Sequence, residues 1–290
     1  MMVADGRVVR HLIKTQFPEY ADLDMVPVSS GGTDHTLFRL GQDLSVRLPK
    51  REDAVAQGEK EHVWLPRLAV ESVRIPTPVA RGQADEKVPF AWSIYDWCPG
   101  QALIHAKSLD FAEIAQTLAR FTLELQSIST RDAPLAGQQN HFRGVALIKR
   151  HQATIAAITG VSDEYPEAAL RAVWEQAISA PSHAQAAVWL HGDLQGGNLL
   201  VREGHLSAII DFGLSGVGDP ACDLMVAWSV LPKDCRAAFR DQLNCDDARW
   251  ARGRGWALSV ATIALDYYRG RNPQLCAISR QTLDAVLEGE

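Results

Sequence analysis

The sequence predicts an α+β protein in which a small β-rich part comes first and a larger helical part follows. Two β-like runs, residues 36–40 and 44–48, flank a Gly41-Gln42-Asp43 turn, which is the pattern of a hairpin. Residues 90–97 form a further apolar and aromatic run, typical of a buried strand. Beyond Pro99-Gly100 the apolar residues recur at helical spacing, so we place the link between two lobes there. The expected lobes are residues 1–97 and 98–290.

Helical periodicity marks most of the remaining chain. Residues 8–17 predict a short amphipathic helix, and residues 54–65 predict a second one that Pro66 should end. Residues 111–128 predict a long helix, with Ser108 or Asp110 as its N-cap. The other expected elements are helices at 145–159 and 167–179, short strands at 188–191, 198–201 and 206–210, and helices after Pro220 that break at Pro232 and Pro273.

Composition indicates an ordinary globular protein. Apolar residues make up 47% of the 290 positions and charged residues 22%, which predicts a sizeable core. A net charge of −6 argues against nucleic-acid binding, which needs clustered cations. The five cysteines include no CxxC pair, so neither a disulfide framework nor a zinc site is expected. Without a signal-peptide core or a membrane-length apolar stretch, the sequence predicts a soluble, cytoplasmic protein.

The most informative segment is His191-Gly192-Asp193-Leu194, followed by Asn198 and then by Asp211-Phe212-Gly213. Phosphoryl transfer needs an acceptor hydroxyl in line with the γ-phosphorus and compensation for charge on the phosphate oxygens. Asp193 can accept the hydroxyl proton, while Asn198 and Asp211 offer the hard oxygen ligands that Mg²⁺ prefers. Either His191-Gly192-Asp193 or Asp211-Phe212-Gly213 alone is common enough to occur by chance. Both at this separation, joined by a hairpin-like stretch, indicate a catalytic segment.

With these residues the chain resembles the aminoglycoside phosphotransferase family, the small-molecule branch of the protein-kinase-like fold. The resemblance implies a bilobal fold that binds ATP or GTP, the phosphoryl donor, with Mg²⁺ between its lobes. It also implies that His191 organises the loop by hydrogen bonds and that Asp223 braces the loop backbone. We interpret Asp219 as the N-cap of a helix with Pro220 at its first position.

The phosphate-binding part of the nucleotide site is predicted from Ser30, Gly31, Gly32 and Arg47. The small residues occupy the place of a phosphate-covering loop, where backbone N–H groups can approach phosphate oxygens. A plain hairpin turn is the alternative. The third strand of the family normally offers a Lys to the phosphates, and the matching cation here is Arg47. Its forked guanidinium can bind phosphate bidentately, although it could instead be a solvent-facing strand residue.

Two further contacts of the nucleotide site follow from the resemblance. Glu61, on the helix after the third strand, would hold Arg47 by an ion pair, with Glu59 as a neighbouring competitor. Asp96 and Cys98 lie just before Pro99-Gly100 and would form the hinge between the lobes. There the backbone C=O of Asp96 and the backbone N–H of Cys98 would meet adenine.

The acceptor pocket is the least determined part of the sequence. Gly253 and Gly255 lie inside a helical stretch, where they permit either close helix packing or the approach of a ligand. Four acidic residues would suit an amino sugar or would simply face water: Asp266, Asp284, Glu288 and Glu290. Arg252 and Arg254 would instead suit an anionic or neutral acceptor.

The sequence therefore predicts transfer of the γ-phosphoryl group to a hydroxyl of a small molecule. An aminoglycoside-type antibiotic is one acceptor that the resemblance suggests, and macrolides or choline- and homoserine-like metabolites are the alternatives. Gly192, where protein kinases carry Arg, and the short run from Asp211 to Asp219 disfavour a protein kinase. The rival from another class is a nucleotide-binding pseudokinase, supported by Arg47 alone. The oligomeric state stays open.

Overall fold

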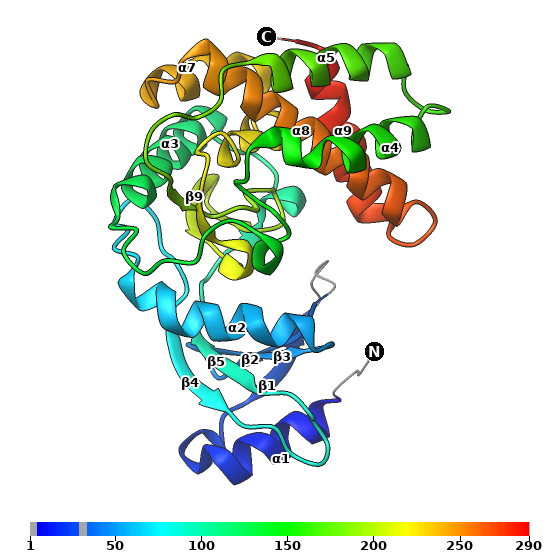
Figure 1. The fold of residues 1–290 in the computed structure, drawn as a ribbon. Coiled ribbons are helices and arrows are strands. Elements are labelled where there is room, and N and C mark those ends of the chain that lie inside the picture. Colours follow the sequence, from blue (N-terminus) through cyan, green and yellow to red (C-terminus); the bar gives the residue numbers. More distant parts are fainter. Residues whose placement is uncertain (1–4, 29–33, 290) are drawn as a thin grey trace.

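The computed structural model describes residues 5–28 and 34–289. Its N-terminal lobe is built around a five-stranded antiparallel sheet. The strand order is β1-β2-β3-β5-β4. The strands are β1 (Met25–Val28), β2 (His35–Leu40), β3 (Leu44–Pro49), β4 (Pro78–Gly82) and β5 (Trp92–Asp96). Helix α1 (Gly6–Gln16) covers one face of this sheet and α2 (Asp53–Trp64) covers the other (Figure 1).

Alternation along β3 directs its side chains to both faces. Val46 and Leu48 are buried in a small apolar core that they share with Leu12 of α1 and Ile94 of β5. Because successive strand residues point to opposite faces, Arg47 points the other way, toward α2. The strand therefore presents one cation to the helix that the sequence predicts to carry its partner.

The C-terminal lobe is mainly helical, with two small sheets at its centre. Its helices are α3 (Phe111–Ser127), α4 (His151–Gly160), α5 (Glu167–Ser179), α6 (Val226–Ser229), α7 (Lys233–Gln242), α8 (Asp247–Tyr268) and α9 (Pro273–Leu287). One sheet has the order β6-β8-β9 and the other pairs β10 with β7. These strands are β6 (Gln101–Ala102), β7 (Val188–Leu190), β8 (Leu199–Arg202), β9 (His205–Ile209) and β10 (Gly216–Gly218).

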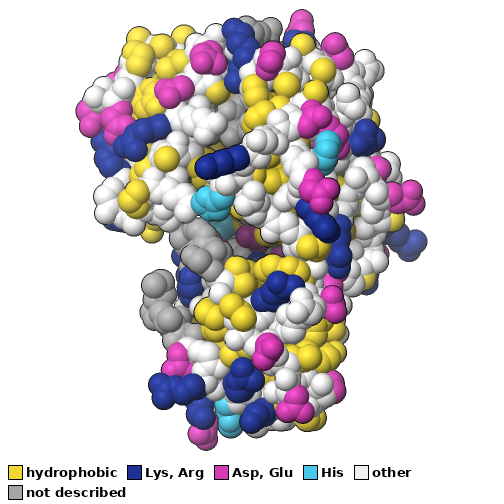
Figure 2. Space-filling view, turned by 180° about the vertical axis from the view of Figure 1, so that it is seen from behind, with side chains coloured by type: hydrophobic (Ala, Val, Ile, Leu, Met, Phe, Trp, Pro, Cys, Tyr) yellow, Lys and Arg dark blue, Asp and Glu magenta, His cyan; other side chains and the backbone are white. Residues whose placement is uncertain are grey.

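Short 3₁₀ helices connect these elements. They lie at Pro18–Tyr20, Leu65–Arg67, Leu103–His105, Gln138–Asn140, Leu147–Arg150, Phe212–Leu214 and Asp223–Met225. The large apolar core of the C-terminal lobe extends to Leu65, Leu68 and Tyr95 of the N-terminal lobe. The two lobes therefore share packing at the end of α2, while the space-filling view shows a hollow between them, with acidic, basic and histidine side chains around it (Figure 2).

The predicted bilobal α+β fold is confirmed, and most elements lie where the sequence places them. Asp110 is the N-cap of α3, accepting a bond from the N–H of Glu113 at 3.0 Å. The helix predicted at 145–159 is wrong at its start, because residues 147–150 form a 3₁₀ helix and α4 begins at His151. Strand β4, which was not predicted, contains Pro78 and Gly82 and lies at the sheet edge, where proline is tolerated.

Among the described residues, no helix is both long enough and apolar enough to cross a membrane.

Candidate active site

Arg47 lies at the centre of a charge network on the N-terminal side of the site. Its Nη1 lies 2.8 and 3.1 Å from the two carboxylate oxygens of Glu61, and its Nη2 lies 3.1 Å from Oδ1 of Asp211. The hydroxyl of Tyr95 donates to Glu61 at 2.7 Å. The ion pair predicted between Arg47 and Glu61 is therefore present. The competitor Glu59 instead pairs with Arg81.

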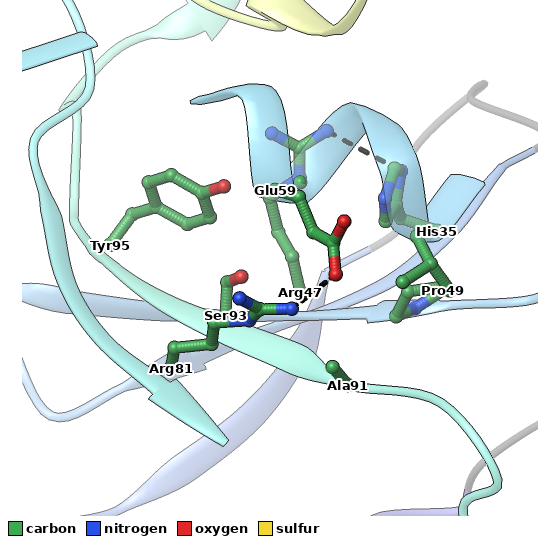
Figure 3. Close-up of a pocket in the computed structure, with 10 residues that line it drawn as sticks. His35, Arg47, Pro49, Glu59, Arg81, Ala91, Ser93 and Tyr95 are labelled. Atoms are coloured by element: carbon green, nitrogen blue, oxygen red, sulfur yellow. Dashed lines mark hydrogen bonds and ion pairs between the residues drawn. The ribbon is translucent and has the colours of Figure 1, made fainter. Parts of the chain in front are cut away.

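Figure 3 shows Arg47 rising from the sheet toward α2, with Tyr95 and His35 on either side of it. Nδ1 of His35 lies 3.4 Å from Nη2 of Arg47. Burial, reinforced by the positive charge of Arg47, lowers the pKa of His35 to about 3, so this imidazole is neutral. These residues line a small cavity between α2 and the sheet, together with Pro49, Glu59, Arg81 and Ser93.

The catalytic segment is held by Asp223. Its two carboxylate oxygens accept bonds from the backbone N–H groups of His191 and Gly192, each at 2.8 Å. The backbone contact predicted for Asp223 is therefore present. Gly192 has a φ of +81°, and a Cβ at this position would lie 2.5 Å from the carbonyl oxygen of Leu214. Only glycine fits there without a shift of the backbone.

His191 is fully buried and links the loop that carries Asp193 to the Asp211-Phe212-Gly213 (DFG) triplet. Its Nε2 lies 3.1 Å from the carbonyl oxygen of Ile210, and its Nδ1 accepts a bond from the N–H of Asp193 at 3.2 Å. Its ring packs against Phe212 with 4.6 Å between centroids. Burial lowers the pKa of His191, which favours the neutral ring with a proton on Nε2.

Asp193 and Asn198 face each other across the loop. The amide nitrogen of Asn198 donates to the carbonyl oxygen and to Oδ2 of Asp193, both at 3.0 Å. The Asp193 side chain keeps 26% of its surface exposed, so a substrate hydroxyl can reach it. Burial raises the pKa of Asp193, although Arg143 acts in the opposite direction. A carboxylate that is partly exposed, oriented by an amide and more basic than usual is suited to accept a proton.

Asp211 and Asn198 provide oxygen atoms that fit a magnesium ion. Asp211 has a φ of +67°, and its side chain is 44% exposed. Burial opposes its ionisation, but its neighbours, Arg47 foremost, together outweigh that effect, and the pKa of Asp211 lies below its ordinary value. Since the nitrogen of Asn198 bonds to Asp193, its oxygen remains the atom for a metal. Mg²⁺ is commonly held by one or two protein groups, phosphates and water, so this small donor set suffices.

The predicted hinge follows β5. The Asp96 carboxylate accepts from Arg74 at 2.7 Å and from the N–H of Thr77 at 2.6 Å, which fixes the end of the strand. Cys98 is buried. Adenine contacts by the backbone of Asp96 and Cys98 stay a prediction. Ser30, Gly31 and Gly32 lie outside the described residues.

The predictions for Asp219 and for the C-terminal arginines need correction. Asp219 begins a turn that leads into a 3₁₀ helix, where no α-helix starts at Pro220. Its Oδ1 still accepts a cap-type bond from the N–H of Ala221 at 3.0 Å, and its carboxylate also forms a buried ion pair with Arg252, whose Nε lies 2.9 Å from Oδ2. Arg254 donates to the carbonyl oxygen of Val286 at 3.0 Å. Both arginines therefore stabilise the lobe.

The glycines of α8 serve helix packing. A Cβ on Gly253 would lie 2.6 Å from Cβ of Leu224, and one on Gly255 would lie 2.4 Å from Cβ of Ala177. Of the two interpretations that the sequence left open, the structure supports close packing.

Sequence reasoning missed Arg143 and Lys60. Nη2 of Arg143 lies 3.6 Å from Oδ1 of Asp193. Nζ of Lys60, on α2, donates to the carbonyl oxygen of Ser215 at 2.8 Å and thereby ties the helix to the segment after DFG. Neither residue belongs to a recognisable motif. Arg143 lies in an irregular loop, and Lys60 carries no signal that separates it from an exposed helix lysine.

Comparison with known proteins gives a family match. The model of the phosphotransferase enzyme family matches residues 24–256. No curated protein sequence matches the chain significantly.

Several solved structures share the fold. One is the GDP and kanamycin complex of APH(2")-IIia, with a TM-score of 0.73 and 18% identity over 97% of this chain and 97% of that chain. A second is the GDP complex of wild-type aminoglycoside 2'-phosphotransferase-IIIa, with a TM-score of 0.72 and 19% identity over 98% and 99% of the two chains. A third is a ternary complex of a thermostable mutant of APH(4)-Ia with AMP-PNP and hygromycin B, with a TM-score of 0.66 and 16% identity over 97% and 98%.

At these identities the structural likeness establishes the fold, and the family match adds the class of enzyme. The chain therefore belongs to the phosphotransferase enzyme family, and it is a small-molecule phosphotransferase of kinase-like fold.

Proposed function

We propose that the protein transfers the γ-phosphoryl group of ATP or GTP to a hydroxyl group of a small molecule. Asp193 acts as the base, and Asn198 and Asp211 hold Mg²⁺. One observation carries the proposal: the base and both proposed metal ligands lie together, with Asn198 bonded to Asp193 at 3.0 Å and the N–H of Ile210, the residue before Asp211, bonded to the carbonyl oxygen of Asn198 at 2.9 Å. A pseudokinase would have no need to keep a partly exposed, basic carboxylate at this position.

The chain's own residues explain the reaction. Asn198 fixes the carboxylate of Asp193, which receives the proton of the acceptor hydroxyl as its oxygen attacks the γ-phosphorus. Asp223 fixes the backbone of His191 and Gly192, which precede Asp193, and so keeps the Asp193 carboxylate in position for the in-line attack. Bound Mg²⁺ supplies neutralisation of the negative charge on the phosphates.

The nucleotide would lie between the lobes. Arg47, kept in place by Glu61, would supply the cation for its phosphates, and backbone N–H groups of Ser30, Gly31 and Gly32 would bind them from the other side, as the sequence predicts. Adenine or guanine would meet the backbone at Asp96 and Cys98. GDP and AMP-PNP bind the structurally similar proteins, which supports a nucleotide donor.

The acceptor class is a separate question. Kanamycin and hygromycin B bind the structurally similar proteins, so aminoglycosides are one class to test. Macrolides and choline- or homoserine-like metabolites are the others.

The free cysteines and the net charge of −6 support a cytoplasmic protein that does not bind nucleic acid.

An acceptor screen with Mg-ATP and Mg-GTP tests this function by the release of ADP or GDP. Asp193→Asn keeps the shape of the side chain but removes the base, so we expect the chemical step to slow by about 10²–10⁴-fold. Asp163→Asn is the matched control, because Asp163 pairs with Arg269 on the surface. Equal turnover by wild type and Asp193→Asn would refute the assignment. Tight nucleotide binding without transfer to any acceptor would favour the pseudokinase.

A further inference from the structure

An arginine faces the catalytic base from the C-terminal lobe. Nη2 of Arg143 lies 3.6 Å from Oδ1 of Asp193, too far for a good hydrogen bond. Nη1 of Arg143 contacts the sulfur of Met225 at 3.8 Å. Arg47 reaches the site from the other lobe, through Asp211. Arg143 therefore brings positive charge to the base from the C-terminal lobe, whereas the proposed phosphate-binding cation, Arg47, belongs to the N-terminal lobe.

A second arginine, Arg150, follows in the same stretch of chain, and its charge interacts with that of Arg143. Its Nε donates to the hydroxyl of Ser259 at 2.9 Å and its Nη1 to the carbonyl oxygen of His141 at 3.3 Å, while its guanidinium lies 5.0 Å from the ring centre of Trp256. Burial and the nearby charge of Arg143 lower the pKa of Arg150 to about 10, so it stays cationic at neutral pH. Within the described part of the chain, no carboxylate lies within ion-pair distance of it.

The carboxylates around Asp193 already have partners of their own. Asp211 pairs with Arg47, and Asp34 pairs with Arg51 at 2.9 Å. Asp223 accepts two backbone N–H bonds. With Asp193 itself facing Arg143, Arg150 is left as positive charge without a matching carboxylate. An acceptor that carries several ammonium groups would be repelled here, whereas an anion would supply the missing charge.

We propose that the acceptor is a hydroxylated anion whose carboxylate or phosphate group binds Arg143 and Arg150 while its hydroxyl meets Asp193. This inference rests on the proposed function and narrows its substrate class. In the transfer, the hydroxyl oxygen forms a bond to the γ-phosphorus and the bond from that phosphorus to the β–γ bridging oxygen breaks. The hydroxyl proton passes to Asp193. The products are a phosphate ester that keeps its anionic group and a nucleoside diphosphate.

Guanidinium groups suit this task because their paired N–H donors match both oxygens of a carboxylate or phosphate. Aromatic support from Trp256 and the bonds to Ser259 and His141 hold Arg150 before the acceptor arrives, which reduces the entropy lost on binding. A charged hydrogen bond of this kind corresponds to about 10–100-fold in affinity. We therefore expect Arg143→Gln or Arg150→Gln to raise the KM for an anionic acceptor by about that factor.

Matched probes separate charge from shape. Glucuronate, glucose and glucosamine share a pyranose ring but differ in charge, and glycerol phosphate paired with glycerol tests phosphate in place of carboxylate. Each is added to the full-length wild-type protein with Mg-ATP, next to kanamycin, and ADP release is followed. We expect the anions to act as acceptors, or to compete with water in the basal hydrolysis of ATP, more strongly than their neutral and cationic counterparts.

Variants assign the effect to the two arginines. Arg143→Gln and Arg150→Gln should abolish the preference for anions, and Arg143→Lys should restore part of it. Arg171→Gln, on the surface of α5, is the control for the loss of one positive charge. If Arg150→Gln fails to fold, Arg143→Gln still tests the inference, because Arg143 lies in a loop and keeps part of its surface exposed.

Three results would overturn the inference. The first is a higher kcat/KM for glucosamine or kanamycin than for any anion. The second is no response of ADP release to any anion at millimolar concentration. The third is an equal fall in kcat for all acceptors in Arg143→Gln, which would indicate contact with the transferred phosphoryl group. In each case ADP release would still depend on Asp193, whereas failure of the proposed function would leave Asp193→Asn as active as wild type.

Discussion

Replacing Arg47 by methionine should destabilise the protein strongly, because it leaves a buried carboxylate without its cation. The side chain of Glu61 is 1% exposed and that of Arg47 is 15% exposed. Removing one partner of a buried ion pair costs about 3–5 kcal/mol of the free energy of unfolding. Tyr95 still donates to Glu61 at 2.7 Å, so we expect a loss at the lower end, about 3 kcal/mol.

Arg81→Met is the matched control for this prediction. Arg81 pairs with Glu59 in the same lobe, but these side chains are 42% and 51% exposed, so the loss should be no more than about 1 kcal/mol. The double variant Arg47→Met/Glu61→Gln removes both buried charges and keeps an acceptor for Tyr95. It should therefore be more stable than Arg47→Met alone by about 2 kcal/mol.

Urea unfolding followed by circular dichroism measures all three variants, with equal m-values as the check that the same surface unfolds. The reasoning fails if Arg47→Met costs no more than Arg81→Met. It also fails if the double variant is as unstable as Arg47→Met, because the cost then arises from lost packing and not from the unpaired carboxylate.

Three further predictions concern the catalytic segment. Gly192→Ala should lower kcat by about 10²-fold or more through displacement of Asp193, while Gly270→Ala, with a φ of +73° and open space around it, should leave kcat unchanged. Asp223→Asn can accept only one of the two backbone bonds, so kcat should fall with little change in the KM for nucleotide; an unchanged kcat would contradict this role. Because Asp193 must be ionised to act, kcat/KM should rise with pH through its raised pKa. Arg143→Gln removes a charge that lowers this pKa and should move the rise to higher pH; an identical pH profile would count against the contact.

Local signals in the sequence predicted the parts of the site that one short segment contains. The spacing of Asp193, Asn198 and Asp211 indicated the reaction, and the resemblance to the family indicated that Glu61, on the helix after β3, pairs with Arg47. Hydrophobic periodicity placed most helices, but it extended one into residues 145–150, where Leu147 is buried while Ile148 is 55% exposed. Alternation of this kind within a 3₁₀ helix has no clear signature in sequence.

Contacts between distant segments could not be predicted. Arg252 pairs with Asp219 across 33 positions, and Arg143 reaches Asp193 from a loop without regular structure. Such partners are set by how α8 and the loops pack on the catalytic segment. From sequence alone, an arginine of α8 that is buried in an ion pair cannot be told from one that faces a ligand. For this reason Arg252 and Arg254 were predicted to face an acceptor.

The buried pair of Asp219 and Arg252 has a consequence for synthesis of the chain. Arg252 also donates to the carbonyl oxygen of Pro181, so it joins three segments that leave the ribosome at different times. The whole phosphoryl-transfer motif is translated before this guanidinium exists. Until α8 emerges, closing the lobe would bury Asp219 without a counter-ion, which is costly. A truncated chain ending before Arg252 would keep every residue of the motif and still be unable to complete the lobe that positions them.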